Sequence, residues 1–365
     1  MVMHQEWALT ALELLENKKV LHPNYEQCRK RLAAACTSIL RGELVVLIGP
    51  SRVGKSRSVQ DALGVRLPIE PDEHEHMRVV MVEAGNDSKG GEFSTKAFMA
   101  ECLKAIRHPI FGVADEDDPW EERLQARIFR TPEGTLRAAF RKALELRHTE
   151  YFVIDEGHHV RYAPGGDVAA ARILDSYKVL ASRSNIKLVL AGSYQLLDLL
   201  ALAPHLLGRQ FPIEFPRYHA ESRADVLAWQ RILKSFSKCI VFGAGESLCD
   251  WNRYLFEGSQ GCVGQLLRWL RATLAIQMSE GAPCLTRQSL EGARTPAYQE
   301  LAILAEIVAG EQHLLRVANA VAGGHQHSAA STGGATKPAH EKKSKNRKRK
   351  PFQRKSRRNK VGGRV

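Results

Sequence analysis

One glycine-rich segment limits what this chain can fold into more than any other feature of the sequence. Residues 49–56 read Gly-Pro-Ser-Arg-Val-Gly-Lys-Ser and match the pattern G-x-x-x-x-G-K-[ST] in full. An apolar run of strand length, residues 44–48, precedes the segment, and a helical stretch begins at about Lys55. This order of strand, glycine-rich turn and helix predicts a parallel α/β sheet that carries the turn at its carboxyl edge.

The chemistry of this segment is suited to phosphate. Its glycines let successive backbone N–H groups point inward around an anion, and the start of the helix adds partial positive charge. Lys55 would reach the β- and γ-phosphates of a nucleotide, and the Ser56 hydroxyl would bind Mg²⁺. We therefore predict a nucleotide-binding loop. Its expected contact residues are Gly49, Pro50, Ser51, Arg52, Val53, Gly54, Lys55, Ser56 and Arg57.

A later apolar run, residues 151–154, ends in two acids, Asp155 and Glu156. If this run is a buried strand, Asp155 lies at the sheet edge where Mg²⁺ would bind, and Glu156 can polarise the attacking water. An ordinary strand end with exposed acids is the alternative, but the pairing with the phosphate loop favours the catalytic interpretation. A guanine-reading N-K-x-D motif is missing, since residues 185–187 are its nearest approach and lack the Asp, so we expect ATP.

Three further residues are candidates for roles at the nucleotide. Ser193 follows the apolar run at residues 188–192, where its hydroxyl can sense the γ-phosphate or cap the next helix. Arg209 precedes the fifth apolar run and is either an arginine finger for a neighbouring subunit's nucleotide or a solvated loop residue. Arg268 can reach back to the nucleotide, although an exposed helix position is the plainer interpretation.

The order of apolar runs and helical stretches predicts the domain organisation. Runs and helices alternate as far as about Tyr218, which predicts a parallel sheet covered on both faces. Only helical stretches follow, the last of them over residues 286–309, which predicts a helical lid. The expected segments are an N-terminal helical segment (1–43), an α/β core (44–217), the lid (218–320), and a disordered linker with a basic tail (321–365), which is too poor in large apolar residues to build a core.

The charge of the chain is concentrated at one end. The net charge is +13, from 53 Lys and Arg against 40 Asp and Glu. Fourteen of the basic residues and one of the acidic residues lie in residues 337–365, which leaves 39 of each sign in the rest of the chain. The body is therefore neutral, and the tail is the part expected to attract phosphate groups, in DNA or RNA, without reading bases.

The remaining composition points to a reducing compartment. Seven cysteines are scattered without a C-x-x-C pair, which argues against a zinc site and a disulfide framework. His158, His159, His325 and His327 have no partners at metal-ligand spacing. The first residues do not read as a signal peptide, and no stretch approaches the ~20 consecutive apolar residues of a membrane span. We expect a cytoplasmic protein with no membrane partner.

The same features resemble the AAA+ ATPases, and more narrowly the TniB/TnsC family of transposition regulators, which are relatives of the phage MuB protein. The resemblance covers about residues 20–295. It rests on five stretches, which are residues 22–25 (His-Pro-Asn-Tyr), residues 48–50 running into 54–56, residues 153–156 with His158, residues 192–193, and residues 258–266 (Gly-Ser-Gln-Gly-Cys-Val-Gly-Gln-Leu) at the start of a lid helix. It implies an α/β fold with an AAA+ P-loop parallel sheet flanked by helices, a C-terminal helical lid, and a disordered basic tail.

The resemblance also implies a function. Proteins of this family form ATP-dependent rings or helical filaments on double-stranded DNA and link a target-selection factor to a transposase. Lys55, Ser56, Asp155 and Glu156 would take the family's nucleotide roles, and Arg209 falls where the family places its finger. Ser193 stands where Thr or Asn is usual, and Arg268 is not a reliable family position. The DNA-facing surface would include residues 85–107, with Lys89 and Lys96 as the candidate contacts.

Two other functions fit the same sequence. The first is a P-loop signalling or defence switch, in which nucleotide exchange changes a protein–protein interface and hydrolysis is slow and independent of DNA. The second is a DNA-tethering module, in which the tail binds and the ATPase site is vestigial. The second acid, Glu156, favours hydrolysis over nucleotide storage, so ATP-driven assembly on DNA is the function that we expect from the sequence.

Overall fold

The computed structural model describes residues 3–18, 20–72, 74–86, 90–112, 120–203 and 208–328. The chain divides into two units, one up to Leu315 and one from Arg316. All of the features described below lie in the first unit, except the end of the last helix.

A parallel sheet forms the centre of the first unit, as the sequence predicts. Within the described residues its strands run in the order β2-β3-β4-β1-β5, and every neighbouring pair is parallel. The strands are β1 (Leu44–Ile48), β2 (Val79–Glu83), β3 (Tyr151–Asp155), β4 (Lys187–Gly192) and β5 (Gln210–Glu214). Each lies within two residues of the apolar run that predicted it. Parallel strands buried on both faces need such continuous apolar runs.

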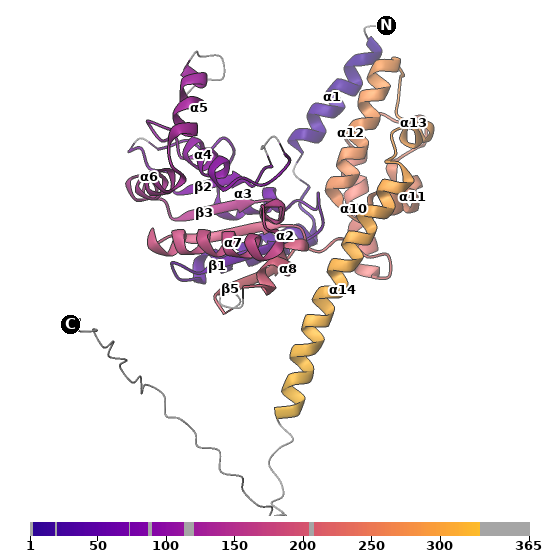
Figure 1. Cartoon of the computed structure of the whole chain (residues 1–365). Coiled ribbons are helices and arrows are strands. Elements are labelled where there is room, and N and C mark those ends of the chain that lie inside the picture. The colour runs from indigo at the N-terminus through magenta and orange to yellow at the C-terminus, as the bar shows by residue number, and fades with distance from the viewer. Residues whose placement is uncertain are drawn as a thin grey trace, which may run out of the picture. The chain divides into compact units, whose positions relative to one another are not determined.

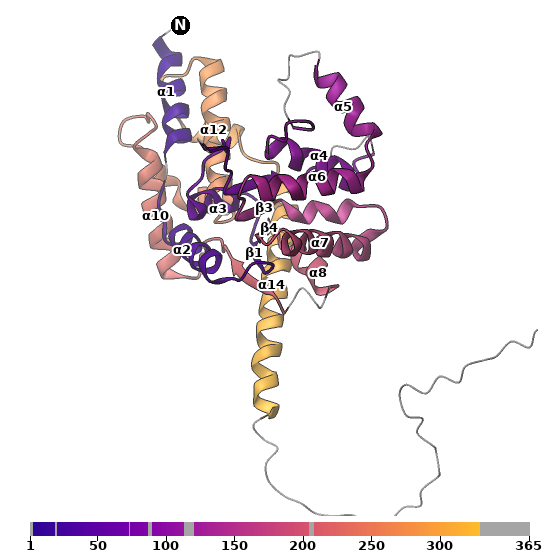
Figure 2. The same cartoon turned by 90° about the vertical axis from the view of Figure 1, so that its left-hand side faces the viewer.

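Alternate residues of β1 point to opposite faces of the sheet and enter two different cores. Leu44 and Val46 pack with the helices of one face, and Val45 and Leu47 pack with those of the other. Figure 2 shows α2 and α3 on one side of the strands and α4, α6, α7 and α8 on the other. The covering helices are α2 (Pro23–Ser38), α3 (Lys55–Leu63), α4 (Thr95–Ala105), α6 (Glu133–Leu146), α7 (Gly166–Arg183) and α8 (Gln195–Ala201).

Beyond β5 the described chain is helical, as predicted, and it builds a core of its own. Trp229, Trp251 and Leu266 are buried there. The helices are α10 (Arg223–Ser237), η2 (Leu248–Trp251), α11 (Asn252–Ser259), α12 (Val263–Glu280), α13 (Arg287–Gly292) and α14 (Ala297–Ser328). None of the described helices is both long enough and apolar enough to cross a bilayer. We call α10 to α13 the lid.

The N-terminal helices belong to two different cores. Helix α1 (Met3–Asn17) buries Ala11 and Leu15 in the core of the lid, and Figures 1 and 2 both show it beside α12. Helix α2 instead packs on the sheet. The backbone N–H of Tyr25 bonds the His22 ring at 3.3 Å, which caps the start of α2. The segment expected as one unit, residues 1–43, therefore contributes to both parts.

Three local features differ from the sequence prediction. Helix α5 (Trp120–Arg130) lies in a stretch for which no element was predicted. The helix expected over residues 286–309 is two helices, because Pro296 has no N–H to continue α13; its carbonyl instead accepts from Gln299 and Glu300 as α14 begins. Helix α14 continues to Ser328, so residues 321–328 are helical where disorder was expected, and residues 329–365 lie outside the described part.

Candidate functional site

The predicted phosphate loop connects β1 to α3, and its glycines are required by its geometry. A side chain at Gly49 would place its Cβ 2.4 Å from the backbone oxygen of Phe215, which leaves no room for one. Gly54 has a φ of 112°, a conformation that favours glycine, and it starts α3 with no side-chain cap. The first backbone N–H groups of α3 are therefore available to an anion.

Lys55 is buried inside the loop. Its side chain is almost fully enclosed, with the residue 4% exposed, and its Nζ donates to the carbonyls of Gly49 (3.1 Å) and Pro50 (2.8 Å). Burial lowers the pKa of Lys55, and the nearby carboxylates of Glu156 and Asp155 oppose that shift. The ammonium is thus held at the loop, with its compensating charges at the end of β3.

Those carboxylates lie at the carboxyl end of β3, which pairs with β2 and β4. Asp155 is the last residue of the strand and is 6% exposed. Glu156 has a φ of 49°, in the left-handed region, which costs a residue other than glycine about 1–3 kcal/mol. Burial raises the pKa of Glu156, and the charge of Lys55 lowers it in part. The chain therefore turns sharply at this acid to present it beside the loop.

The loop and Glu156 line one cavity of about 550 Å³. A nucleotide fits a cleft of this size. Its lining residues are Ser51, Arg52, Gly54, Lys55, Ser56, Arg57, Glu83, Glu156, His158 and His159. The structure thus brings together the predicted residues from two segments that lie about a hundred positions apart in the sequence.

Three lining residues had no role in the sequence prediction. Glu83 ends β2 and stands opposite Asp155 in the strand register, one residue past the predicted strand end. His158 and His159 follow the acidic pair after Gly157, and neither was assigned a role, although His158 belongs to one of the stretches that carry the family resemblance. The Nδ1 atom of His159 is 2.7 Å from the carbonyl of Ala84. Only the strand register, which a single sequence does not reveal, places Glu83 here.

His158 connects the acidic pair to Ser193. Its Nδ1 accepts a hydrogen bond from the backbone N–H of Ser193 at 3.3 Å and lies 3.2 Å from Oε2 of Glu156. Burial lowers the pKa of His158 to about 4, so the ring is neutral near pH 7. Ser193 ends β4 and is 1% exposed, and its hydroxyl has no hydrogen-bond partner among the described residues. It lies beside the cavity but does not line it.

The remaining predicted residues lie away from this cavity. The Arg209 carbonyl accepts from Leu44, which places it at the amino edge of the sheet. The five residues of β1 span about 16 Å, so Arg209 cannot contact the loop of its own subunit. Arg268 lines a different cavity of about 170 Å³. The Nζ of Lys96 donates to the carbonyl of Phe129 at 2.6 Å, and Lys89 lies outside the described residues.

The lid touches the phosphate loop directly. A Cβ at Gly264, in the first turn of α12, would lie 2.0 Å from the carbonyl oxygen of Arg52. The backbones of the lid and the loop can approach this closely only because residue 264 has no side chain. A ligand that moves the loop must therefore either move the lid with it or pull the loop away from the lid.

Helix α14 crosses the core next to Ser193. A Cβ at Gly310 would lie 2.2 Å from the ring of Tyr194, the residue after Ser193. The next residue, Glu311, accepts two hydrogen bonds from Arg217, at 2.8 and 3.1 Å. The end of β4, the chain after β5 and α14 are thus held together on the side of the sheet that carries the site.

The oxygen atoms at the cavity suit a hard cation that a bound nucleotide also helps to coordinate. The described residues contain no group of three or more His, Cys, Asp or Glu that could enclose a metal ion. They offer instead the Ser56 hydroxyl and the Glu83 carboxylate, which line the cavity, and the carboxylate of Asp155, the register partner of Glu83. Mg²⁺ is commonly bound by one or two protein oxygens, with phosphates and water completing its shell. The residues present therefore fit Mg²⁺ bound together with a nucleotide.

Comparisons with known proteins agree with this geometry. Residues 39–200 match the family model of the AAA domain, and this stretch contains the phosphate loop, the acidic pair and Ser193. No curated protein sequence matches the chain. Cdc6p from Pyrobaculum aerophilum has a similar structure, with a TM-score of 0.50 and 15% sequence identity, over 80% of this chain and 73% of its own.

Two other solved structures are similar at lower scores. A Walker-type ATPase of Pyrococcus abyssi has 17% identity and a TM-score of 0.44, over 80% of this chain and 75% of its own. The ORC2 protein of Aeropyrum pernix, in its ADPNP–ADP complexes, has 12% identity and a TM-score of 0.46, over 77% and 70%. The strand order, the phosphate loop and the helical C-terminal part give the chain the AAA+ P-loop fold, and its residues 39–200 match the model of the AAA domain.

Proposed function

We propose that this protein binds ATP with Mg²⁺ in the 550 Å³ cavity and hydrolyses it. The observation that carries the proposal is the buried Lys55 ammonium at the phosphate loop, beside the carboxylate of Glu156 on the same cavity. Two backbone carbonyls and the charges of Glu156 and Asp155 hold this buried ammonium at the loop, where a triphosphate would be a further anionic partner. The free N–H groups at the start of α3 add to the attraction.

Each residue has a separate task in this proposal. Lys55 gives up its contacts with the Gly49 and Pro50 carbonyls and binds the β- and γ-phosphates. Mg²⁺ neutralises phosphate charge, and Ser56 and Asp155 are the residues that would hold it. Glu156 orients the attacking water and accepts its proton. His158, held by the backbone N–H of Ser193, lies beside Glu156 but donates no hydrogen bond to it from Nδ1, which accepts that N–H.

We further propose that the protein assembles on double-stranded DNA with ATP and links a target-selection factor to a transposase, with hydrolysis controlling disassembly. This part rests on the sequence resemblance to transposition regulators and on the basic tail. The position of Arg209 supports it. Because Arg209 is exposed at the amino edge of the sheet, it is available to the nucleotide of a neighbouring subunit but not to its own.

Two substitutions test the ATPase proposal. Lys55→Ala should abolish ATP binding in a calorimeter and ATP-dependent assembly on duplex DNA. Glu156→Gln should keep ATP binding, lower hydrolysis about 10²–10⁴-fold and hold assemblies on DNA. Lys234→Ala, which removes an exposed lysine from α10, is the matched control and should change neither. Normal ATP binding by Lys55→Ala, or rapid release of Glu156→Gln from DNA, would contradict these roles.

The same measurements separate this function from a nucleotide-dependent signalling switch. Residues 194 and 310 are packed together beside Ser193, so a change at the phosphates could reach the last described helix and alter a protein contact there. A switch would hydrolyse ATP slowly, and DNA would not change the rate. We expect duplex DNA to accelerate hydrolysis by the wild-type protein.

A further inference from the structure

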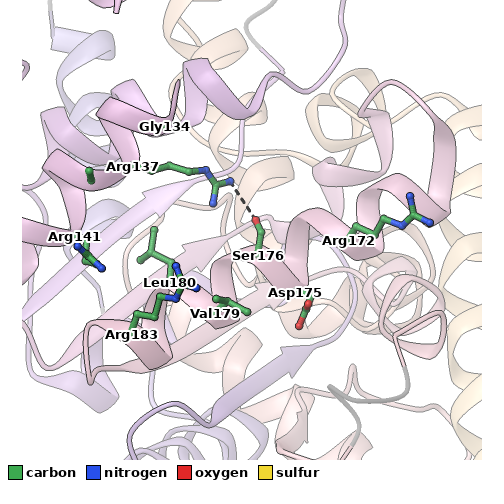
Figure 3. A pocket seen from close by; sticks show the side chains of 10 residues that line it. Gly134, Arg137, Arg141, Arg172, Asp175, Ser176, Val179, Leu180 and Arg183 are labelled. Carbon is green, nitrogen blue, oxygen red and sulfur yellow. Dashed lines mark hydrogen bonds between the residues drawn. The ribbon is translucent and has the colours of Figure 1, made fainter. Parts of the chain in front are cut away.

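An arginine-lined groove lies between α6 and α7, on the face of the sheet opposite α2 and α3. It has a volume of about 540 Å³. Four of its lining residues are arginines, Arg137 and Arg141 from α6 and Arg172 and Arg183 from α7, against one acid, Asp175. Figure 3 shows these side chains on facing sides of the groove, with Arg137 reaching across to Ser176. None of the residues of the nucleotide cavity takes part.

Most of this positive charge is not neutralised. Arg137 bonds Glu133 at 2.9 Å and the Ser176 hydroxyl at 3.1 Å. Arg141, Arg172 and Arg183 are exposed and form no hydrogen bond or ion pair within the described part of the chain. Three free guanidinium groups around one groove repel each other unless an anionic group binds between them. The groove therefore favours an acidic ligand.

The floor of the groove selects the kind of ligand. Ala138, Val179 and Leu180 line it, so it is apolar between the arginines. A duplex DNA backbone is bound by exposed cations on an open surface and gains nothing from an apolar floor. An acidic peptide that also carries a large apolar side chain matches both parts of the groove, because its carboxylates meet the guanidinium groups while the apolar group covers the floor.

The chain itself contains such a peptide. Residues 115–122 read Asp-Glu-Asp-Asp-Pro-Trp-Glu-Glu, six acids around Trp120, and the portion up to residue 119 lies outside the described residues. Along α7 the positions 172 and 183 are about 16 Å apart. The five residues 115–119, which precede α5, would span up to about 17 Å if extended, so this part of the peptide is long enough to follow the groove. Its charge is opposite to that of the groove within a body that is neutral overall.

From this complementarity we infer that the arginine groove of one copy of the protein binds the acidic segment, residues 115–122, of a second copy. The two surfaces differ, so the contact is head-to-tail. Such a contact continues from copy to copy and generates rings or filaments. The inference rests on the assembly that we propose above and adds a contact to it, one that does not involve bound nucleotide.

Charge reversal tests this contact. The groove variant carries Arg141→Glu, Arg172→Glu and Arg183→Glu, and the segment variant carries Asp115→Lys, Glu116→Lys and Asp117→Lys. Sedimentation velocity with ATP and Mg²⁺ should show self-association at least about tenfold weaker for each variant alone, since three exposed ion pairs are lost. Mixing the two variants should restore association, because each then meets a surface of opposite charge. Pairing within one chain would not respond to mixing.

A control variant carries Arg223→Glu, Arg231→Glu and Lys234→Glu, the same change in charge on the exposed face of α10, and should associate like the wild type. If mixing does not restore association, or if the control is as weak as the groove variant, the proposed contact is wrong. Binding of a fluorescent ATP analogue by each variant is measured in parallel. If the wild type binds the analogue but stays monomeric with ATP and duplex DNA, the assembly part of the proposed function fails instead.

Discussion

At the scale of single residues, the site combines a strained acid with one neutral, half-buried histidine, His158. Glu156 adopts a left-handed conformation that only a well-packed surrounding maintains. The ring of His158 lies beside it, and the backbone N–H of Ser193 bonds that ring. Because burial depresses the pKa of His158 to about 4, the ring remains an acceptor for that N–H across the physiological range. The acid therefore has an uncharged neighbour there, one that does not donate to it from Nδ1.

A second buried histidine leads to a prediction for stability. His22 is buried, and its Nδ1 is bonded by the Tyr25 N–H and lies 2.8 Å from the hydroxyl of Tyr218, where the core meets the lid. Burial lowers the pKa of His22 from 6.5 to about 4. Its folded-state pKa is below the unfolded value, so the unfolded chain takes up the proton first as the pH falls. The stability that neutral His22 contributes is fully present above pH 6.5 and is lost as the pH falls from 6.5 to 4.

This single histidine should therefore remove up to about 3 kcal/mol from the free energy of unfolding as the pH falls through that window. His22→Asn keeps an acceptor for the Tyr25 N–H but does not titrate. Urea denaturation at pH 7.5 and pH 4.5 should show a smaller loss of stability for His22→Asn than for the wild type. Equal losses in the two proteins would mean that His22 does not titrate as proposed.

At the scale of elements, the sequence predicted the strands well because each coincides with a short run rich in apolar residues, which the fold buries fully in β1 and β3 and only in part in the edge strand β5. It missed α5, whose residues are mostly polar and charged, and it joined α13 to α14 across Pro296. For the site, local patterns were sufficient for Lys55 and Glu156. The position of Glu83 at the site depends on strand register, and the distance of Arg209 from the site depends on which edge of the sheet Arg209 occupies. Both are properties of the assembled sheet.

The contact between α12 and the phosphate loop gives a prediction at this scale. Gly264→Ala would add a methyl group where the Arg52 carbonyl already lies, so the lid and the loop must separate. We expect ATP binding to weaken by about 1–3 kcal/mol, roughly 5- to 150-fold, although alanine is the better helix former. Titration with a fluorescent ATP analogue measures the change.

Gly292→Ala is the matched control, because a Cβ at Gly292 in α13 meets no atom within 4 Å. It should leave ATP binding unchanged. Wild-type affinity in Gly264→Ala would show that the lid can shift at no cost to the nucleotide site.

At the scale of the whole chain, charge is separated along the sequence. The body carries 39 residues of each sign, and the excess of thirteen lies in residues 337–365. Within the neutral body, the arginine groove and the acidic segment at residues 115–122 are again separated. A neutral body does not attract DNA over long distances, whereas a segment with fourteen basic residues does. In the function that we propose, the tail therefore contributes to DNA binding through charge, and the body contributes through nucleotide-dependent assembly.

Deleting residues 337–365 should test that division. Each phosphate that the tail neutralises contributes about 0.9 to the slope of log affinity against log salt concentration. The truncated protein should bind duplex DNA with a slope shallower by several units and with lower affinity at low salt, while ATP-dependent assembly remains. A variant whose tail has the same residues in shuffled order should behave like the wild type, because phosphate attraction does not depend on sequence. If shuffling weakens binding as much as deletion does, the tail recognises a specific partner and not DNA charge. If deletion alone abolishes all DNA binding and Lys55→Ala has no effect on it, the protein is a tether and its ATPase site is dispensable.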